Sequence, residues 1–212
     1  MNTQNRKIQT PFAPALWPTL LEPQLYSAPG ITPKAGDKGR YSVTLQFDPD
    51  NSDHKEFLEV LEALGDDLIK EIKEKEPRAK INDPLIPCEP DMDKEGNETG
   101  LMNVKFARNA GGISERSGKA WTARIGLYDR KGQKYVHDDS QGEMANGTRL
   151  RVEAEVNQYK MSGRHGVSLR LTAAQISEVQ YYGEGQSSFA GVEVAPEEFE
   201  EGAADLDTGG DF

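Results

Sequence analysis

Apolar residues recur along this chain in two patterns, a helical one in a single segment and an alternating one in several others. In SDHKEFLEVLEALGDDLIKEIKEKEP (52–77) the apolar positions are Phe57, Val60, Leu61, Leu64, Leu68 and Ile72. Offsets of 3, 4, 7, 11 and 15 from the first of them place these side chains on one face of an amphipathic helix. Asp53 followed by Glu56 predicts a capping box at the helix start, and Pro77 marks the helix end. We expect this helix to pack on a sheet.

Five other segments alternate apolar and polar residues with a period of two, which is typical of strands with one face inward. They are RYSVTLQF (40–47), LMNVKFAR (101–108), AWTARIGLY (120–128), RLRVEAEV (149–156) and GVSLRLTA (166–173). Trp121 is expected in the core, whereas Trp17, in the loop-like APALWPTL, fits either the core or the surface. Five strands and one inserted helix predict a mainly β fold, either a small barrel or a half-open sheet.

Turn residues and composition set the boundaries between these segments. DRKG (129–132) predicts a turn, and SGRHG (162–166) predicts a hairpin between the last two long strands. Residues 81–100 are Pro-rich and then acidic, which predicts a long surface loop. Residues 183–212 combine low hydrophobicity with uniform negative charge, which predicts disorder. The chain is therefore predicted to hold one folded domain, residues 1–182, and a disordered acidic tail, residues 183–212.

Cysteine use and hydropathy limit the cellular setting. Cys88 is the only cysteine, which excludes an intramolecular disulfide and a multi-cysteine zinc site and suits a reducing cytoplasm. No stretch approaches the roughly 20 apolar residues of a membrane span, and the first residues lack the apolar core of a signal peptide. We expect a soluble intracellular protein with no membrane partner.

The net charge of −11 hides a strong segregation of charge along the chain. Residues 183–212 hold nine acids and no bases, and residues 48–100 hold 17 acids against 7 bases. Residues 101–170, in contrast, hold 13 bases against 7 acids, a net charge of +6. One face of the folded domain is therefore expected to be basic although the whole protein is acidic.

The acidic residues and histidines predict neither a metal site nor a cofactor. Asp91, Asp93 and Glu95, followed by Gly96, resemble the opening of a calcium loop. The twelfth position, which should be a bidentate Glu, is Met102, so a solvated acidic loop fits better. The three histidines share no metal-ligand spacing.

Catalytic signatures are also missing, since the sequence has no P-loop, no GxSxG elbow and no HExxH motif. We therefore predict no enzymatic activity. A metal-dependent nuclease is a weaker alternative, because Glu153, Glu155 and Lys160 follow Asp91 at a spacing that does not suit such a site.

Basic and aromatic residues form the better-supported candidate site, on the polar faces of the predicted strands and at the adjoining turns. Single-stranded nucleic acid requires this mixture, because cations follow the phosphates while aromatic faces stack on unpaired bases without reading sequence. The alternative is ordinary solvated surface charge. The candidate DNA-binding residues are Lys105, Arg124, Tyr128, Arg130, Lys131, Lys134, Tyr135, Arg151, Tyr159, Lys160, Arg164 and Arg170.

Several segments, taken in order, resemble the single-stranded-DNA-binding proteins of tailed bacteriophages. They are APALWPTLLEPQ, RYSVTLQF before an acidic helix, GLMNVKFARN, RHGVSLRLTAAQISEVQ and an acidic tail that ends in Asp211-Phe212. The similarity covers most of the chain and implies an oligonucleotide/oligosaccharide-binding fold (OB fold). It also implies sequence-nonspecific binding of single-stranded DNA during phage DNA replication, recombination or repair in the cytoplasm of the infected bacterial host.

The resemblance further implies that the acidic tail docks on replication proteins such as DNA polymerase and competes with DNA for the basic cleft. An anionic strand mimics a polyphosphate, and one terminal ring can fill an apolar pocket. The alternative, a solubility appendage, explains the charge but not the terminal ring. The candidate partner-binding residues are Asp205, Asp207, Asp211 and Phe212.

Two further functions stay open at this point. An acidic interaction or chaperone protein would use its sheet to hold another protein and would not bind oligo-dT in a salt-dependent way. A nuclease would need a divalent metal and would degrade the same oligonucleotide. A homodimer is compatible with the sequence, which does not determine the oligomeric state.

Overall fold

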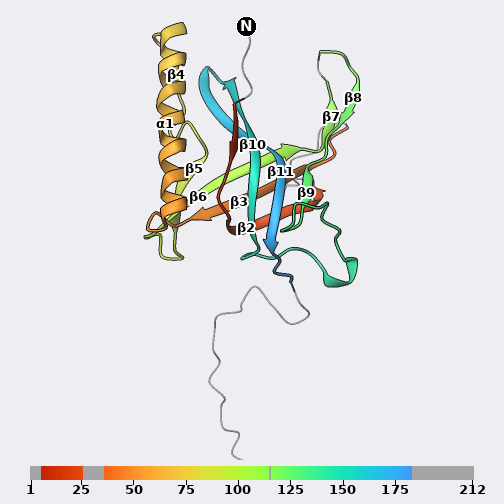
Figure 1. Ribbon diagram of the computed structural model, residues 1–212. Coiled ribbons are helices and arrows are strands. Elements are labelled where there is room, and N and C mark those ends of the chain that lie inside the picture. Colours follow the sequence, from red (N-terminus) through yellow and green to blue (C-terminus); the bar gives the residue numbers. More distant parts are fainter. Residues whose placement is uncertain (1–5, 26–35, 115, 183–212) are drawn as a thin grey trace, which may run out of the picture.

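The computed structural model describes residues 6–25, 36–114 and 116–182, and these form a β barrel with one α-helix beside it (Figure 1). A mainly β fold with one inserted helix was predicted and is confirmed. The elements are β1 (Lys7–Gln9), β2 (Ala13–Gln24), β3 (Arg40–Phe47), α1 (Ser52–Lys75), β4 (Lys80–Ile81), β5 (Cys88–Met92), β6 (Glu98–Asn109), β7 (Gly111–Ile113), β8 (Ala120–Thr122), β9 (Gly126–Tyr128), the 3-10 helix η1 (Asp139–Gln141), β10 (Arg149–Met161) and β11 (Arg164–Glu178).

Five strands close the barrel in the order β10, β2, β3, β6 and β11, with β11 returning to β10. Every pairing in this ring is antiparallel except that of β6 with β11, where Phe106 lies beside Leu169. The alternating apolar residues of β3, β6, β10 and β11 point into the ring and are buried, as the period of two predicts. The five-stranded ring thus confirms the predicted barrel.

The ring strand β2 was predicted to be a loop, and that prediction was wrong. The segment holds three prolines, which are unusual in a central strand because proline cannot donate a ladder hydrogen bond. In the structure β2 bulges between Leu16 and Thr19, where the register against β3 shifts by one residue. Trp17 takes the bulge position with a φ of 48°, and its N–H donates to Asn146 Oδ1 at 2.6 Å. The bulge accommodates Pro18, and it leaves the Trp17 side chain 65% exposed.

The segment AWTARIGLY was predicted to be one strand and forms two. Residues 120–122 become β8, which pairs with β7 in a hairpin outside the barrel. Residues 126–128 become β9, which pairs parallel with β11. Trp121 was expected in the core and is 41% exposed, because β8 belongs to the separate β7–β8 sheet outside the barrel.

Helix α1 is confirmed, with its start set by a different residue from the predicted one. Asn51 is the N-cap, and its side chain accepts from the N–H groups of Asp53 and His54, so the expected Asp53–Glu56 box does not form. The Phe57 ring packs against Phe47 at 4.9 Å, whereas Val60, predicted on the apolar face, is 52% exposed. The helix packs through one narrow stripe on the barrel.

Residues 81–100 were predicted to be a long surface loop, and that prediction is wrong in part. Cys88–Met92 form β5, which pairs antiparallel with β6 through a turn at 93–97. Asp93 Oδ1 accepts from the N–H groups of Glu95 and Asn97, so the acidic residues organise a hairpin turn. The tail of residues 183–212 lies outside the described residues. Within the described parts of the chain, no helix is long and apolar enough to cross a membrane.

Candidate nucleic-acid interface

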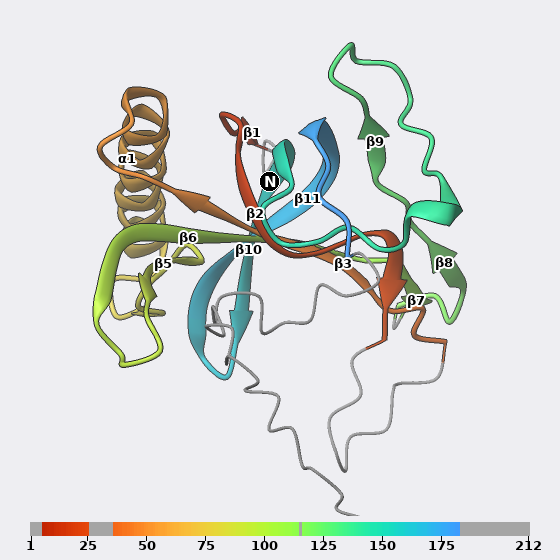
Figure 2. The same ribbon diagram turned by 90° about the horizontal axis from the view of Figure 1, so that it is seen from below.

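Helix α1 and the strands β7, β8 and β9 lie on opposite sides of the barrel (Figures 1 and 2). The sequence of α1 holds four lysines and eight acids, a net charge of −4. Residues 111–135, which include β7, β8 and β9, hold six bases and two acids, a net charge of +4. The segregation of charge in the sequence therefore becomes a segregation in space, with the basic side away from the helix.

The larger group of predicted residues surrounds β9. Tyr128 and Arg151 line the same pocket of about 200 Å³, together with Gly132 and Gln175. Arg151 Nε donates to Gln175 Oε1 at 2.8 Å, and Gln175 Nε2 donates to the Arg130 carbonyl at 3.2 Å. Gln175 therefore connects strand β10 to the turn after β9. We define this β9 group as Tyr128, Arg130, Lys131, Lys134 and Arg151.

The predicted turn at 129–132 is confirmed and presents two cations. Asp129 Oδ1 accepts from the N–H groups of Lys131 and Gln133, at 2.9 and 2.8 Å. Gly132 has a φ of 77°, a conformation that glycine adopts without the strain of a side chain. The local turn chemistry thus holds Arg130 and Lys131 exposed on the surface.

A second group lies at the tip of the predicted β10–β11 hairpin, which is also confirmed. We define this tip group as Tyr159, Lys160 and Arg164. The turn residues Ser162 and Gly163 have φ values of 52° and 77°, as a tight two-residue hairpin turn requires. Lys160 Nζ donates to both carboxylate oxygens of Glu76, which caps the end of α1. The ion pair fixes the tip against the helix and compensates the charge of Lys160.

Two of the predicted stacking rings lie against glycines. A Cβ on Gly126 would meet the Tyr128 ring at 2.8 Å, and a Cβ on Gly166 would meet the Tyr159 ring at 2.5 Å. A side chain at either glycine would therefore displace the ring above it, and the two rings remain 42% and 37% exposed. One face of each ring covers backbone, and the exposed remainder is available to stack on a base.

Tyr135, the third predicted stacking residue, lies in a different environment. Its ring packs half-buried against the core, and its hydroxyl lies 2.8 Å from the Tyr181 hydroxyl. Burial, and then the bond with Tyr181, raises the pKa of the Tyr135 hydroxyl. This position suits a structural role better than base stacking.

The remaining predicted residues lie apart from the two groups. Lys105 is exposed on β6 opposite Thr44 of β3, and Arg124 is exposed just before β9. Arg170 pairs with Glu155 across β10 and β11. Of the nine predicted cations, Lys160 and Arg170 have salt bridges, so seven have no salt bridge to a described carboxylate. These seven are free to neutralise phosphates.

Sequence reasoning missed the basic residues next to the β7–β8 hairpin. Lys38, Arg116 and Lys119 are exposed there, and the misplaced Trp121 lies between them and Arg124 in the sequence. The basic excess of residues 101–170 was the signal for Arg116 and Lys119, whereas Lys38 lies outside that range, and none of the three belongs to the predicted strand faces. The tail candidates Asp205, Asp207, Asp211 and Phe212 lie outside the described residues. In the described chain, no three His, Cys, Asp or Glu side chains gather as a metal site requires.

The barrel resembles solved structures of known function. Neither a family model nor a curated protein matches the sequence. The crystal structure of gp2.5, a single-stranded DNA binding protein encoded by bacteriophage T7, matches with a TM-score of 0.56 and 16% identity, over 85% of this chain and 91% of that one. The single-stranded DNA-binding protein of bacteriophage Enc34 in complex with ssDNA matches with a TM-score of 0.56 and 13% identity, over 84% and 89%. The chain therefore has the fold of bacteriophage single-stranded DNA-binding proteins.

Proposed function

We propose that this chain binds single-stranded DNA with little sequence preference and performs no chemistry on it. One observation carries the proposal: the barrel shared with phage single-stranded DNA-binding proteins presents cations that have no salt bridge to a described carboxylate, together with the half-exposed rings of Tyr128 on the basic side and Tyr159 at the hairpin tip beside α1. Cations attract phosphates of any sequence, and aromatic rings stack on any unpaired base. The β9 group is the centre of this interface.

The two proposed groups have different roles within the interface. In the β9 group, Arg151 and the Tyr128 ring line one pocket, which Glu153 also lines. Arg130, Lys131 and Lys134 are exposed on and after the neighbouring turn, so the group offers cations for phosphates beside a ring for a base. The tip group presents Tyr159 and Arg164, while Lys160 is compensated by Glu76. Lys105 and Arg124 are outlying candidate contacts, and Arg170 is compensated by Glu155 as Lys160 is by Glu76.

The biological setting that we infer is DNA replication, recombination or repair of a phage in the cytoplasm of its bacterial host. The acidic tail, residues 183–212, would recruit replication proteins such as DNA polymerase, with Asp205, Asp207, Asp211 and Phe212 as the contacts. Its net charge of −9 also makes it a competitor for the basic side. A homodimer remains compatible with this role.

A gel-shift series that compares single-stranded and double-stranded DNA of equal length tests the proposal. Stacking requires unpaired bases, so the single strand should bind more tightly. Incubation with Mg²⁺ should leave the oligonucleotide intact, because the proposal includes no hydrolysis. Equal binding to both forms, or degradation of the single strand, would contradict it.

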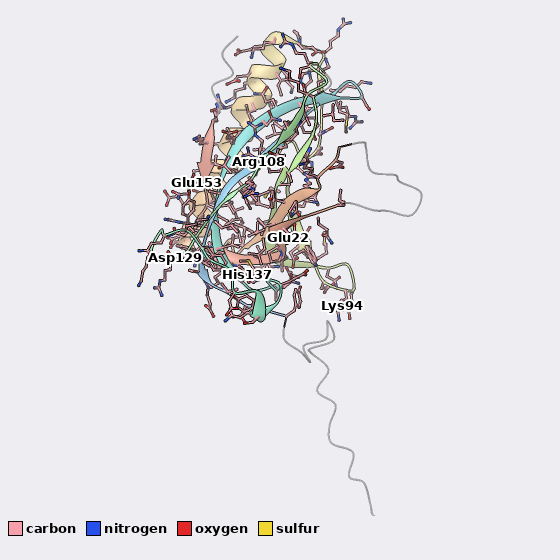
Figure 3. All side chains as sticks on the ribbon, turned by 90° about the vertical axis from the view of Figure 1, so that its right-hand side faces the viewer. Glu22, Lys94, Arg108, Asp129, His137 and Glu153 are labelled. Carbon is pink, nitrogen blue, oxygen red and sulfur yellow. The ribbon has the colours of Figure 1, made fainter. Side chains whose placement is uncertain are left out.

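A charge-reversed control separates a specific surface from general electrostatics. Lys94 is exposed on the turn between β5 and β6, and Figure 3 shows it well apart from the Asp129 turn. Lys94→Glu changes the net charge as much as Lys131→Glu does. Only the Lys131 variant should weaken binding to the single strand if the β9 group is the interface.

A further inference from the structure

The β7–β8 hairpin stands off the barrel on the side away from α1 (Figure 1). Among the described strands, its two strands pair only with each other, with Gly112 opposite Trp121 and Ile113 opposite Ala120. The N–H of Ser114 donates to the Lys119 carbonyl, which extends the hairpin to its turn. A separate two-stranded sheet of this kind contributes little to the core, so its side chains need another explanation.

The two faces of this hairpin differ in what covers them. A Cβ on Gly36 would meet the Ile113 side chain at 2.8 Å, and a Cβ on Gly111 would meet the Lys38 side chain at 2.9 Å. Gly111 and Ile113 share one face because side chains alternate along a strand. Residues 36–38 therefore contact that face, although Ile113 remains 47% exposed, and the opposite face carries Gly112 and Trp121.

Trp121 lies across the backbone of Gly112. A Cβ at Gly112 would be 3.5 Å from the indole Nε1 and 3.6 Å from two of its ring carbons, which is ordinary van der Waals contact. The same side chain remains 41% exposed. One side of the indole thus rests on backbone, as the rings of Tyr128 and Tyr159 do on their glycines, and the exposed remainder faces solvent.

The charges around Trp121 are all positive within residues 116–124. This stretch holds Arg116, Lys119 and Arg124 and no acid, and none of the three has a salt bridge to a described carboxylate. Lys119 shares the face of Trp121 by alternation along the strand. An exposed indole next to unpaired cations provides one surface for a base and another for its phosphates.

We propose that the β7–β8 hairpin is a second contact for single-stranded DNA, in which Trp121 stacks on a base and Lys119 and Arg116 neutralise the adjoining phosphates. The inference rests on the proposed function and extends its interface beyond the β9 and tip groups. Paired bases in a duplex offer no free face within the strand, so the contact favours unpaired DNA.

Tryptophan fluorescence tests the contact directly. Trp17 is the only other tryptophan, so in the full-length Trp17→Phe variant the emission reports on Trp121 alone. Titration with oligo-dT should quench this emission, and the quenching should saturate together with the anisotropy of a labelled oligo-dT. Saturating anisotropy with unchanged Trp121 emission would overturn the proposal.

Substitution gives an independent readout. Trp121→Ala should weaken oligo-dT binding about 5- to 150-fold, the range expected for one lost base stack, without changing the salt slope. Lys119→Ala should lower the salt slope by about one unit. Met92→Ala, a change at an exposed apolar side chain of β5, is the matched control and should leave affinity unchanged.

The failures of the two proposals are distinguishable. If the unsubstituted protein does not bind oligo-dT, the proposed function falls. If it binds, but Trp121→Ala binds equally well with an unchanged thermal midpoint, only the hairpin contact falls. If Trp121→Ala is unstable, the fluorescence titration of Trp17→Phe still tests the hairpin contact. Trp121→Phe, which keeps an aromatic ring, should retain most of the affinity for oligo-dT.

Discussion

The ammonium group of Lys160 lies 2.7 and 2.8 Å from the two carboxylate oxygens of Glu76. His165 Nε2 lies 3.0 Å from the same carboxylate, so two residues of the β10–β11 hairpin contact one residue at the end of α1. A carboxylate at a helix C-terminus is disfavoured by the helix dipole. The two partners offset that repulsion and fix the hairpin tip relative to the helix.

This contact predicts a pH-dependent contribution to stability. Hydrogen bonds from Lys160, and then from His165, hold the pKa of Glu76 below its ordinary value of 4.5. Because the unfolded chain then binds the proton more tightly, the contribution is present above the unfolded pKa and is lost as the pH falls through the folded pKa. Glu76→Gln should lower the thermal midpoint at pH 7, and the difference should shrink well below pH 4.5.

Thermal melts of the matched variant Glu74→Gln provide the control, because Glu74 is exposed on α1 without a salt bridge to a described residue. Its midpoint should follow that of the unsubstituted protein at every pH. A constant difference between Glu76→Gln and the unsubstituted protein, from neutral to acidic pH, would show that the ion pair contributes nothing.

Charge reversal on the basic side should weaken binding to all single-stranded sequences alike. Arg124→Glu and Lys131→Glu remove exposed cations, so each should lower the salt slope of binding by roughly one unit per lost phosphate contact. Arg151→Glu should weaken binding too, but it also removes the bond to Gln175 and the contact with the Phe12 ring. The thermal midpoint of Arg151→Glu must therefore be measured together with its affinity for single-stranded DNA, to separate a loss of stability from a loss of binding. Unchanged affinity in all three variants would exclude this side as the interface.

The three tyrosines should separate by their surroundings. Tyr128→Ala and Tyr159→Ala should each weaken single-stranded DNA binding by about 1 to 3 kcal/mol, because both rings are partly exposed over glycine. Isothermal titration with oligo-dT measures these losses. A loss in neither variant would assign both rings to covering their glycines.

Tyr135→Phe should act on stability instead. It removes the hydroxyl that pairs with Tyr181, so the free energy of unfolding should fall by about 0.5 to 1.5 kcal/mol. Denaturant unfolding gives this value, and DNA affinity should not change. A loss of affinity at unchanged stability would return Tyr135 to the interface.

Deletion of residues 193–212 should raise DNA affinity, because it removes eight acidic side chains that compete for the basic side. The gain should be greatest at low salt, since the Debye length is already about 10 Å at 0.1 M. Binding titrations at several salt concentrations measure it. Equal affinities with and without the tail at every salt concentration would exclude competition.

Phe212→Ala keeps every charge of the tail and should therefore leave DNA affinity nearly unchanged. It should reduce capture of a replication protein in a pull-down from infected cells, because the apolar anchor is lost. Undiminished capture, together with a deletion that leaves DNA affinity unchanged, would make the tail a solubility appendage.

Strong periodicity made most of the barrel predictable. Strands β3, β6, β10 and β11 alternate, so most of their inward side chains could be named from the sequence, although Ala174 and Ile176 of β11 lie beyond the predicted strand. Strand β2 could not be predicted, because its prolines are tolerated only through the bulge at Trp17, which a period-two pattern does not reveal. Pairing with β3 and β10 holds β2 in the barrel although its own sequence does not show a strand pattern.

The candidate site was less predictable because exposure depends on which layer covers a segment. Trp121 belongs to an alternating pattern identical in kind to that of the buried strands, yet in the described part of the chain its strand pairs with β7 alone, outside the barrel. The sequence identifies Lys160 and Arg170 as cations. It does not reveal their salt bridges with Glu76 and Glu155, because these form between segments that are distant in the sequence. The basic excess of residues 101–170 indicated where the candidate site lies. The tertiary structure determines which of its cations are exposed and without a salt bridge to a described carboxylate.

The most direct test of the central claim is an anisotropy titration of labelled oligo-dT with the full-length protein across a series of salt concentrations, with unlabelled duplex DNA as competitor. We predict saturable binding, a linear fall of log K with log salt concentration, and weak competition by the duplex. Absence of binding at low salt, or competition by the duplex as strong as by unlabelled oligo-dT, would contradict the assignment of this barrel as a single-stranded DNA-binding protein.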